Sequence, residues 1–256
     1  MIDLAREVAR EAGALICEGK QHMRVEHKGA VDLVTQLDQA SEDLIRKRFQ
    51  KAEPGIPILA EEGGGAENET TRWIVDPLDG TTNFVHDFPF YCVSIALETD
   101  GVLELAVIYD IANHRLYEAE RGKGAKRDGE KLSVSTESSL NHALVASGFA
   151  YDRRSRADFY LAYVKRFLET AQGFRRCGSA AMDLAMLAEG KLDAYWEFGL
   201  NPWDVAAGAL IVQEAGGQVS DVTGAPLGLN EPRILASNGH LHEAMIQQIA
   251  PIFDTI

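Results

Sequence analysis

The sequence predicts a protein of mixed α and β structure whose two halves are organised differently. Between Trp73 and Val134, short runs of β-forming residues follow one another with turn residues between them, whereas after residue 139 such runs alternate with helical ones. Consecutive strands joined by turns favour an antiparallel meander, and alternation favours a mixed or parallel sheet covered by helices. We therefore expect an α+β half at residues 1–138 and an α/β half at residues 139–256, with the boundary in the polar stretch 133–139.

Two helices are expected at the start of the chain, the first of them amphipathic. Apolar residues recur at helical spacing over residues 2–18, and Gly19 is suited to end that helix. Thr35 and Asp38 have the spacing of a capping box, in which each side chain binds a backbone N–H group of the other residue. This pattern predicts a second helix that runs to about Gln50.

The antiparallel meander is expected to follow these helices and to pack on them. Four runs have the composition of strands: Trp73–Val75, Tyr91–Leu97, Val102–Tyr109 and His114–Glu120. The dipeptides Asp100-Gly101 and Asp128-Gly129 are typical of tight turns between antiparallel strands. A further short apolar run, residues 56–60, precedes them.

The second half is expected to alternate between strands and helices. Strands are predicted at His142–Ser147, Phe174–Cys177, Leu192–Glu197, Gln218–Val222 and Ile234–Ala236. Helices are predicted near 156–170, 179–189, 202–215 and 240–250. Asn201 and Pro202 have the residue types preferred at the N-cap and first position of the third of these helices.

Composition and charge indicate a globular protein and argue against one functional class, the non-specific nucleic acid binders. The 256 residues are enough for one large domain or two small ones, and 46% of them are hydrophobic, as in a globular protein. Lys and Arg number 25 against 39 Asp and Glu, so the formal net charge is −14. Because such a surface repels phosphate backbones, we expect no non-specific nucleic acid binding.

The cysteines and the hydropathy pattern predict a cellular environment. Cys17, Cys92 and Cys177 are scattered and form no CxxC pair, so we expect buried, reduced thiols. No apolar run approaches the ~18 residues of a membrane span, and charged residues in the first turns exclude a signal core. We expect a cytoplasmic protein with no membrane association.

Several acidic residues lie where predicted elements end. Asp76 and Asp79 follow the apolar run of WIVDPLDGTTNF, and Gly80 and Thr81 could open a turn or helix whose free amides bind a phosphate. Glu61 likewise follows an apolar run. Carboxylates without nearby His or Cys suit Mg²⁺ or Ca²⁺ better than zinc.

Each of these acids also has an ordinary structural interpretation, and the residues alone leave it open. Asp76 and Asp79 could form an Asx-Pro turn with an Asp-Gly corner, and Glu61 could be solvated in a loop. Asp204 could serve only to stabilise the dipole of its helix, and Asp38 could serve only in its capping box. The acids do not alternate as in an EF-hand, and two residues separate Asp76 from Asp79, where the haloacid dehalogenase pattern has one.

Taken together, the motifs resemble the inositol monophosphatase family, whose members are magnesium-dependent, lithium-sensitive phosphatases. The resemblance runs over nearly the whole chain. It rests on VDLVTQLD at 31–38, EEG at 61–63, WIVDPLDGTTNFVH at 73–86, FPF at 88–90, GKGA at 122–125, GSAA at 178–181 and WDVAAGALIVQEAGG at 203–217. The implied fold is a layered αβαβα sandwich of the inositol monophosphatase and fructose-1,6-bisphosphatase type, usually dimeric, so a homodimer is expected.

The resemblance also implies a role for individual residues. Two or three Mg²⁺ ions are expected per site, held by Glu61, Asp76, the Leu78 carbonyl, Asp79 and Asp204. A third ion would rely on Glu61, which is therefore counted with the catalytic residues. Thr81 and Asp38 would orient and activate the attacking water. The substrate would contact Asp79, Gly80, Thr81, Gly178, Ser179, Ala180, Glu197 and Asp204, with Glu197 accepting a hydroxyl.

The implied function is Mg²⁺-dependent hydrolysis of a small polyol phosphate, with myo-inositol 1-phosphate as the first candidate. Relatives with the same metal motif act on fructose 1,6-bisphosphate, histidinol phosphate or 3′-phosphoadenosine 5′-phosphate. The basic cluster with Arg153 and Arg154 is either a solvated helix start or a second phosphate contact. An alternative of another class is a regulatory protein that keeps the fold and binds a macromolecular partner.

Overall fold

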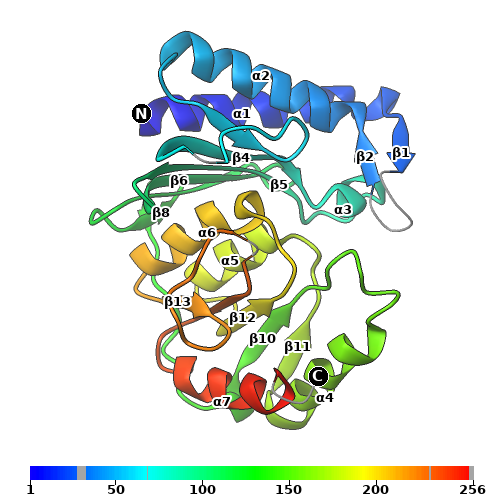
Figure 1. The fold of residues 1–256 in the computed structure, drawn as a ribbon, viewed down its shortest axis with the longest axis vertical. Helices are drawn as coiled ribbons and strands as arrows, with labels where there is room; N and C mark the ends of the chain where they lie inside the picture. Colours follow the sequence, from blue (N-terminus) through cyan, green and yellow to red (C-terminus); the bar gives the residue numbers. More distant parts are fainter. Residues whose placement is uncertain (28–32, 68, 231, 254–256) are drawn as a thin grey trace.

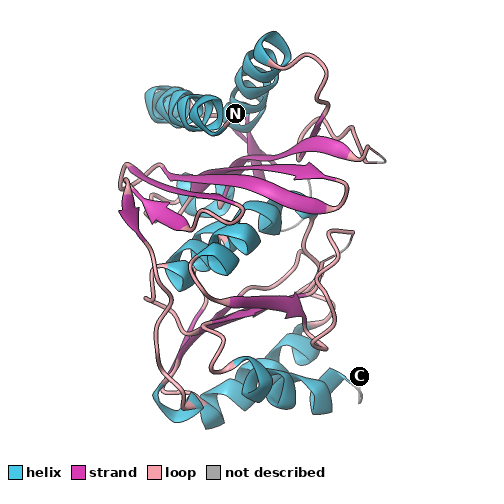
Figure 2. Cartoon of the chain, turned by 90° about the vertical axis from the view of Figure 1, so that its left-hand side faces the viewer, coloured by secondary structure: helices cyan, strands magenta, loops and turns pink. Residues whose placement is uncertain are grey.

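The computed structural model describes residues 1–27, 33–67, 69–230 and 232–253. The first two residues of the VDLVTQLD motif, 31 and 32, lie outside them. Five layers are stacked from one end of the molecule to the other (Figures 1 and 2). In order, they are helices α1 (Ile2–Gly19) and α2 (Gln36–Ala52), a seven-stranded sheet, helices α5 (Ala180–Ala188) and α6 (Pro202–Glu214), a five-stranded sheet, and helices α4 (Ala157–Thr170) and α7 (His242–Phe253). The predicted layered αβαβα fold is thus observed.

The seven-stranded sheet contains the predicted meander. Its strands follow chain order: β3 (Ile58–Ala60), β4 (Thr71–Asp79), β5 (Cys92–Thr99), β6 (Val102–Asp110), β7 (Arg115–Glu120), β8 (Ala125–Arg127) and β9 (Glu130–Lys131). All neighbouring pairs are antiparallel except β3 and β4, which are parallel. Asp100 and Asp128 both have positive φ, followed by glycines with positive φ, as the predicted tight turns require.

The five-stranded sheet is mixed, as the alternating pattern predicts. Its order is β11 (Gly173–Arg175), β10 (Leu144–Ser147), β12 (Ala194–Glu197), β14 (Ile234–Ser237) and β13 (Gln218–Asp221). The pairs of β10 are parallel and those of β14 are antiparallel. The division of the chain into domains at 138/139 stays a prediction.

Three apolar cores lie between the layers. One joins α1 and α2 to the seven-stranded sheet, where the rings of Phe49 and Trp73 stack with centroids 4.2 Å apart. A second lies around α5 and α6, between the two sheets. The third joins α4 and α7 to the five-stranded sheet. Among the described residues, no helix is both long and apolar enough to cross a membrane.

The prediction that the first meander strand ends at Val75 is wrong. β4 continues through Asp79, with a break in its register between Asp76 and Asp79. Pro77 lies in this break, where a residue without an N–H group is tolerated because no ladder hydrogen bond is required. The two acids are therefore held in a bulged strand rather than in a loop.

Other element boundaries also differ from the sequence prediction. The strand expected at Phe174–Cys177 ends at Arg175, and a 3₁₀ turn (Leu140–His142) delays β10 to Leu144. The short hairpin of β1 (Val25–His27) and β2 (Leu33–Thr35) was not predicted. Cys92 is buried as expected, but Cys17 is exposed and Cys177 is only partly buried, so the prediction of three buried thiols is wrong.

Candidate active site

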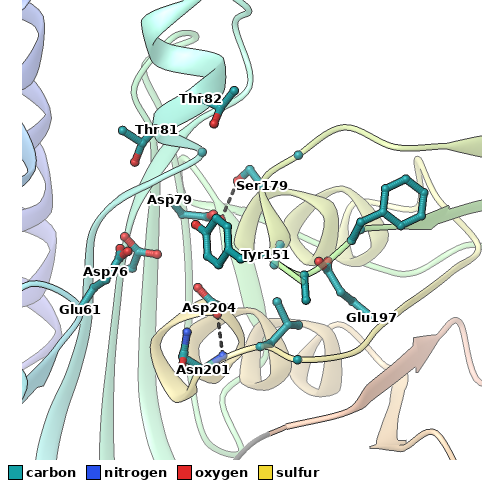
Figure 3. A pocket seen from close by; sticks show the side chains of 18 of the residues that line it. Glu61, Asp76, Asp79, Thr81, Thr82, Tyr151, Ser179, Glu197, Asn201 and Asp204 are labelled. Carbon is teal, nitrogen blue, oxygen red and sulfur yellow. Dashed lines mark hydrogen bonds between the residues drawn. The ribbon is translucent and has the colours of Figure 1, made fainter. Parts of the chain in front are cut away.

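A single pocket collects nearly every predicted site residue. Asp38 is the exception, because it lies behind Thr81 rather than in the wall. Glu61 and Asp76 lie together at one side, and Asp79 and Asp204 lie close by (Figure 3). Glu197 lies at the other side, with Tyr151 between (Figure 3). We call the end of the pocket with these four carboxylates the acidic end. The opposite end holds a single carboxylate, that of Glu197.

The bulge of β4 positions the two acids of the DPLDG motif. The Asp76 carboxylate accepts a hydrogen bond from the Leu78 N–H group at 3.0 Å. The Pro77 carbonyl accepts one from the Ser41 hydroxyl of α2 at 2.9 Å. Asp76, Leu78 and Asp79 all reach the same pocket because the bulge breaks the strict alternation of side chains along the strand.

Gly80 turns the chain from β4 into the short helix α3 (Thr81–Val85). Its φ of +90° lies in the left-handed region, and a Cβ atom there would come within 2.9 Å of the Phe90 carbonyl oxygen. Only glycine combines both requirements. The first N–H groups of α3 have no partner within the helix, and Gly80, Thr81 and Thr82 at this helix start line the pocket.

Asp79 is anchored by the start of α5. Its Oδ2 atom accepts a hydrogen bond from the Ser179 hydroxyl at 2.6 Å (Figure 3). The same atom accepts one from the Ala181 N–H group at 2.8 Å. Ser179 is also the N-cap of α5. Because α5 belongs to the central layer, this contact ties the seven-stranded sheet to the second half of the chain.

Asp204 enters the pocket from the start of α6. Its carboxylate accepts a hydrogen bond from the Asn201 N–H group at 2.6 Å, and the two residues form a capping box with Pro202 at the first helical turn (Figure 3). The predicted helix start is therefore confirmed. Capping uses one oxygen of Asp204, and the residue also lines the pocket.

Asp38 is held so that one of its oxygen atoms faces Thr81. The Oδ2 atom accepts hydrogen bonds from the N–H group and the hydroxyl of Thr35, at 2.8 and 2.6 Å. The Oδ1 atom lies 2.9 Å from the Thr81 hydroxyl, which is also 3.0 Å from the Leu78 carbonyl. A hydroxyl donates one proton, so Thr81 can serve only one of these acceptors at a time. Burial raises the pKa of Asp38, despite hydrogen bonds that lower it.

At the opposite end of the pocket, Glu197 is buried and accepts a hydrogen bond from the Tyr195 hydroxyl. Burial raises the pKa of Glu197 to about 7, although this hydrogen bond and the charges of Arg176 and Arg153 act to lower it. Both arginines line the pocket, whereas Arg154 does not.

The acids at the other end are strongly perturbed. Burial raises the pKa of Asp76 well above its usual value, and the charges of Glu61, Asp79 and Asp204 raise it further. The pKa of Asp204 is raised well above its usual value by the same two effects, and burial raises that of Asp79 to about 6. Charges of one sign thus face one another in a buried place, and a cation would relieve this repulsion.

The oxygen atoms that the acidic end offers as metal ligands fit Mg²⁺. They are carboxylate oxygens and one carbonyl oxygen, the hard ligands that this ion takes in proteins. As they stand, no three acidic, His or Cys side chains of the described residues converge closely enough to hold an ion. Asp76, Asp79 and Asp204 are instead each hydrogen-bonded to a neighbouring N–H group.

Sequence reasoning missed several residues that line or support this pocket. Arg176, Tyr151 and Thr82 line it. Arg176 immediately precedes Cys177 and the GSAA motif, and that proximity was the available signal. Glu42 of α2 accepts hydrogen bonds from the N–H groups of the two residues after Glu61 and pairs with Arg46. Glu42 and Arg46 have the spacing of an ordinary surface ion pair, so no pattern in the sequence distinguishes them.

Comparison with known proteins places the chain among relatives along its full length. The sequence model of the inositol monophosphatase family matches residues 1–252. A relative from Pseudomonas aeruginosa, named Nus factor SuhB, is 42% identical over 98% of this chain and 96% of its own. A Synechocystis relative, named inositol-1-monophosphatase, is 42% identical over 97% of this chain and 88% of its own.

A solved structure of the extragenic suppressor protein suhB from Bartonella henselae has a TM-score of 0.91 with 37% identity, and covers 97% of both chains. The family model covers nearly the whole sequence, and the fold matches that of a solved relative. The chain therefore belongs to the inositol monophosphatase family.

Proposed function

We propose that this protein is a Mg²⁺-dependent phosphomonoesterase that hydrolyses a small polyol phosphate, with myo-inositol 1-phosphate as the first candidate. The observation that carries the proposal is the shared pocket, in which four acids, the glycine turn into α3 and Glu197 come together. The existence of relatives named inositol-1-monophosphatase supports the choice of substrate.

In this proposal, the acidic end holds the ions. Glu61, Asp76 and the Leu78 carbonyl would hold the first ion, and Asp76, Asp79 and Asp204 would hold the second. A third would rely on Glu61. Bound Mg²⁺ neutralises charge on the phosphate, lowers the pKa of water and stabilises the leaving alkoxide. Without a cation, the carboxylates would repel a phosphate dianion by several kcal/mol per close pair, at an effective dielectric constant of about 20.

The chain's own groups would bind the phosphate and the attacking water. The amides of Gly80 and Thr81 would donate hydrogen bonds to phosphate oxygens. With its proton donated to Asp38, the Thr81 hydroxyl would present a lone pair that accepts a hydrogen bond from the water. Asp38, whose pKa is raised by burial, would then receive the proton that Thr81 passes on.

The polyol would occupy the end of the pocket that holds Glu197. Gly178, Ser179 and Ala180 line the same pocket and would contact the substrate, and the Ser179 hydroxyl binds Asp79. An ionised Glu197 accepts hydrogen bonds only, which suits the hydroxyl groups of a sugar or cyclitol. Because the Tyr195 hydroxyl already binds this carboxylate, its orientation is set before the substrate enters.

The test is phosphate release from myo-inositol 1-phosphate, fructose 1,6-bisphosphate and histidinol phosphate in Mg²⁺, with EDTA and lithium as controls. Fast, Mg²⁺-dependent and lithium-sensitive release from the first is expected. Asp79→Asn should nearly abolish turnover in a folded protein. Unchanged turnover in that variant would contradict the metal assignment.

A bisphosphate substrate is the second candidate, and it is favoured by Arg153 and Arg176 in the wall of the pocket. Burial lowers the pKa of Arg153, and repulsion from the charge of Arg176 lowers it further. A second anionic group would offset this repulsion. Arg153→Ala and Arg176→Ala should then impair bisphosphate hydrolysis more than monophosphate hydrolysis, with Arg154→Ala as the control. Equal effects on both substrates would exclude this candidate.

A partner-binding role is a further candidate, because several relatives are named Nus factor SuhB. Such a role would not require turnover. A phenotype restored by Asp79→Asn would depend on binding and not on catalysis. Light scattering of the purified protein would establish the oligomeric state in which it binds such a partner. A homodimer is expected.

A further inference from the structure

Helix α2 contacts the loop that follows Glu61 through a buried carboxylate. Glu42 is only 3% exposed. Its Oε2 atom accepts a hydrogen bond from the Glu62 N–H group at 2.8 Å, and its Oε1 atom accepts one from the Gly63 N–H group at 2.9 Å. Arg46 donates to the same Oε1 atom at 2.7 Å. All three partners are hydrogen-bond donors. A carboxylate can accept from all of them, because both of its oxygen atoms are acceptors.

Arg46 extends this contact to the rest of the loop. Its guanidinium donates to the carbonyl of Gly64 at 2.8 Å and reaches that of Ile58 at 3.4 Å. Ala60 and Gly64 close the loop by a pair of backbone hydrogen bonds, at 2.9 and 3.3 Å. The fork of one arginine therefore holds both ends of the segment that contains Glu61.

The fit between this ion pair and the loop is close. A Cβ atom at position 63 would come within 2.6 Å of Glu42 Oε1 and within 3.0 Å of an Arg46 nitrogen. A side chain at position 63 would therefore have to displace the Glu42–Arg46 pair. The glycine of the EEG motif is explained by this contact rather than by backbone conformation.

The same face of α2 also contacts the stretch of chain that runs from the bulge of β4 into α3. Ser41 donates to the Pro77 carbonyl in the bulge of β4, and Asp38 accepts from Thr81 at the start of α3. Residues 38, 41, 42 and 46 have helical spacing and lie along one face. One helix thus contacts both stretches of chain that form this part of the acidic end, the loop after Glu61 and residues 77–81.

We infer that Glu42 and Arg46 are positioning residues that hold Glu61 in place for the cation, without touching the cation or substrate themselves. The inference rests on the proposed function, because it takes Glu61 as a metal ligand. Groups that orient a ligand in this way typically change metal affinity by about 10–100-fold when they are replaced.

Glu42→Gln is the first test. The glutamine side chain has a similar shape, but its NH₂ group would face a donor, so one contact to the loop or to Arg46 is lost. The expected result is a Mg²⁺ half-saturation concentration raised on the order of 10-fold, with kcat at saturating Mg²⁺ close to that of the wild type. A second readout is the rise in Tm that Mg²⁺ produces, which does not depend on turnover.

The chain offers a matched control in Glu98→Gln. Glu98 and Arg72 form another buried ion pair, with 2.7 Å between Oε2 and Nε, and Arg72 also donates to two backbone carbonyls. Neither residue lines the pocket. We expect Glu98→Gln to lower the Tm of the Mg²⁺-free protein and to leave the Mg²⁺ response unchanged.

Arg46→Lys is the second variant, for the case that Glu42→Gln does not fold. A lysine keeps the charge next to Glu42 but cannot bind two carbonyls in a fork, so a smaller shift in the same direction is expected. The inference is overturned if Mg²⁺ affinity is unchanged in both α2 variants, or if Glu98→Gln shifts it equally. If the wild type itself shows no Mg²⁺ response in Tm, the proposed function has failed, and the inference falls with it.

Discussion

At the scale of single residues, the site depends on hydrogen bonds that leave one atom of each functional group available. Asp38 illustrates this. Thr35 occupies its Oδ2 atom, so that only Oδ1 faces Thr81. A capping box, which is usually read as a stabilising feature of a helix, here also orients an acid toward the pocket.

Asp38→Asn tests this role. The amide cannot accept a proton, so kcat is expected to fall by roughly 10²–10⁴-fold while Mg²⁺ half-saturation changes little. Asp221→Asn is the control, because Asp221 also accepts hydrogen bonds from the N–H group and the hydroxyl of a threonine, Thr223. Asp221 lies in β13 and does not line the pocket. Wild-type kcat in Asp38→Asn would exclude a role in proton transfer.

Gly80→Ala tests the turn into α3. A positive φ costs a non-glycine residue roughly 1–2 kcal/mol. At position 80 a Cβ atom would in addition meet the Phe90 carbonyl at 2.9 Å. Gly101 has a φ of +77° with no atom within 4 Å of an added Cβ, so Gly101→Ala measures the backbone cost alone. We expect Gly80→Ala to lower Tm further than Gly101→Ala does and, unlike it, to lose activity. Equal effects would show that the space around Gly80 does not matter.

At the scale of secondary-structure elements, buried polar residues connect helices to sheets. His242, at the start of α7, is buried between Ser220 of β13 and Ser237 of β14. Its ring nitrogens lie 2.8 and 3.0 Å from the two serine hydroxyls. Burial lowers the pKa of His242, and the nearby charge of Glu243 opposes this only in part.

This arrangement predicts a loss of stability in acid. The folded state favours neutral His242, so the unfolded state binds more protons once the pH falls below the ordinary histidine pKa of about 6.5. Its contribution is thus fully present above that pH and decreases as the pH falls toward the lowered pKa of the folded state.

Urea unfolding at pH 7.5 and 5.5, in EDTA, would measure this effect. The urea midpoint of the wild type should fall more on acidification than that of His242→Gln. His240→Gln removes an exposed histidine close by and should behave like the wild type. The site acids titrate in all three proteins, so their contribution cancels in the comparison. Parallel losses in His242→Gln and the wild type would exclude His242 as the source.

At the scale of the whole molecule, α5 and α6 form a central layer that packs against both sheets. They also hold the site together, because α5 anchors Asp79 and α6 contributes Asp204. The two helices pack closely at Gly208, where an added Cβ atom would come within 2.5 Å of Leu184 Cβ. The pocket is therefore sensitive to the spacing between these helices.

In Gly208→Ala, two effects of known size act on stability in opposite directions. Alanine favours the helix by about 1 kcal/mol over glycine, whereas overpacking a core costs about 1–3 kcal/mol. The clash involves an atom next to the backbone of α5, which cannot move aside on its own, so we expect a net decrease in Tm. Gly55→Ala, with no atom within 4 Å, is the control and should leave Tm nearly unchanged. A higher Tm in Gly208→Ala would show that the helices separate at little cost.

The sequence by itself determined the local structure and the chemistry of the candidate groups. Helix α2 and its capping box, the Asp100-Gly101 and Asp128-Gly129 turns, and the start of α6 at Asn201 all follow from interactions between residues close in the chain. Such interactions are encoded by residue type and spacing, so patterns can predict them. The motifs also predicted the family and the layered fold.

Tertiary structure alone decided which distant groups meet. The bulge that carries Asp76 and Asp79, the anchoring of Asp79 by Ser179, and the contact of Glu42 with the loop after Glu61 join segments separated by up to a hundred residues. Arg176 reaches the pocket for the same reason. Contacts of this kind depend on how whole layers pack, and an isolated charged residue has the same sequence pattern whether it is solvated or buried beside a site.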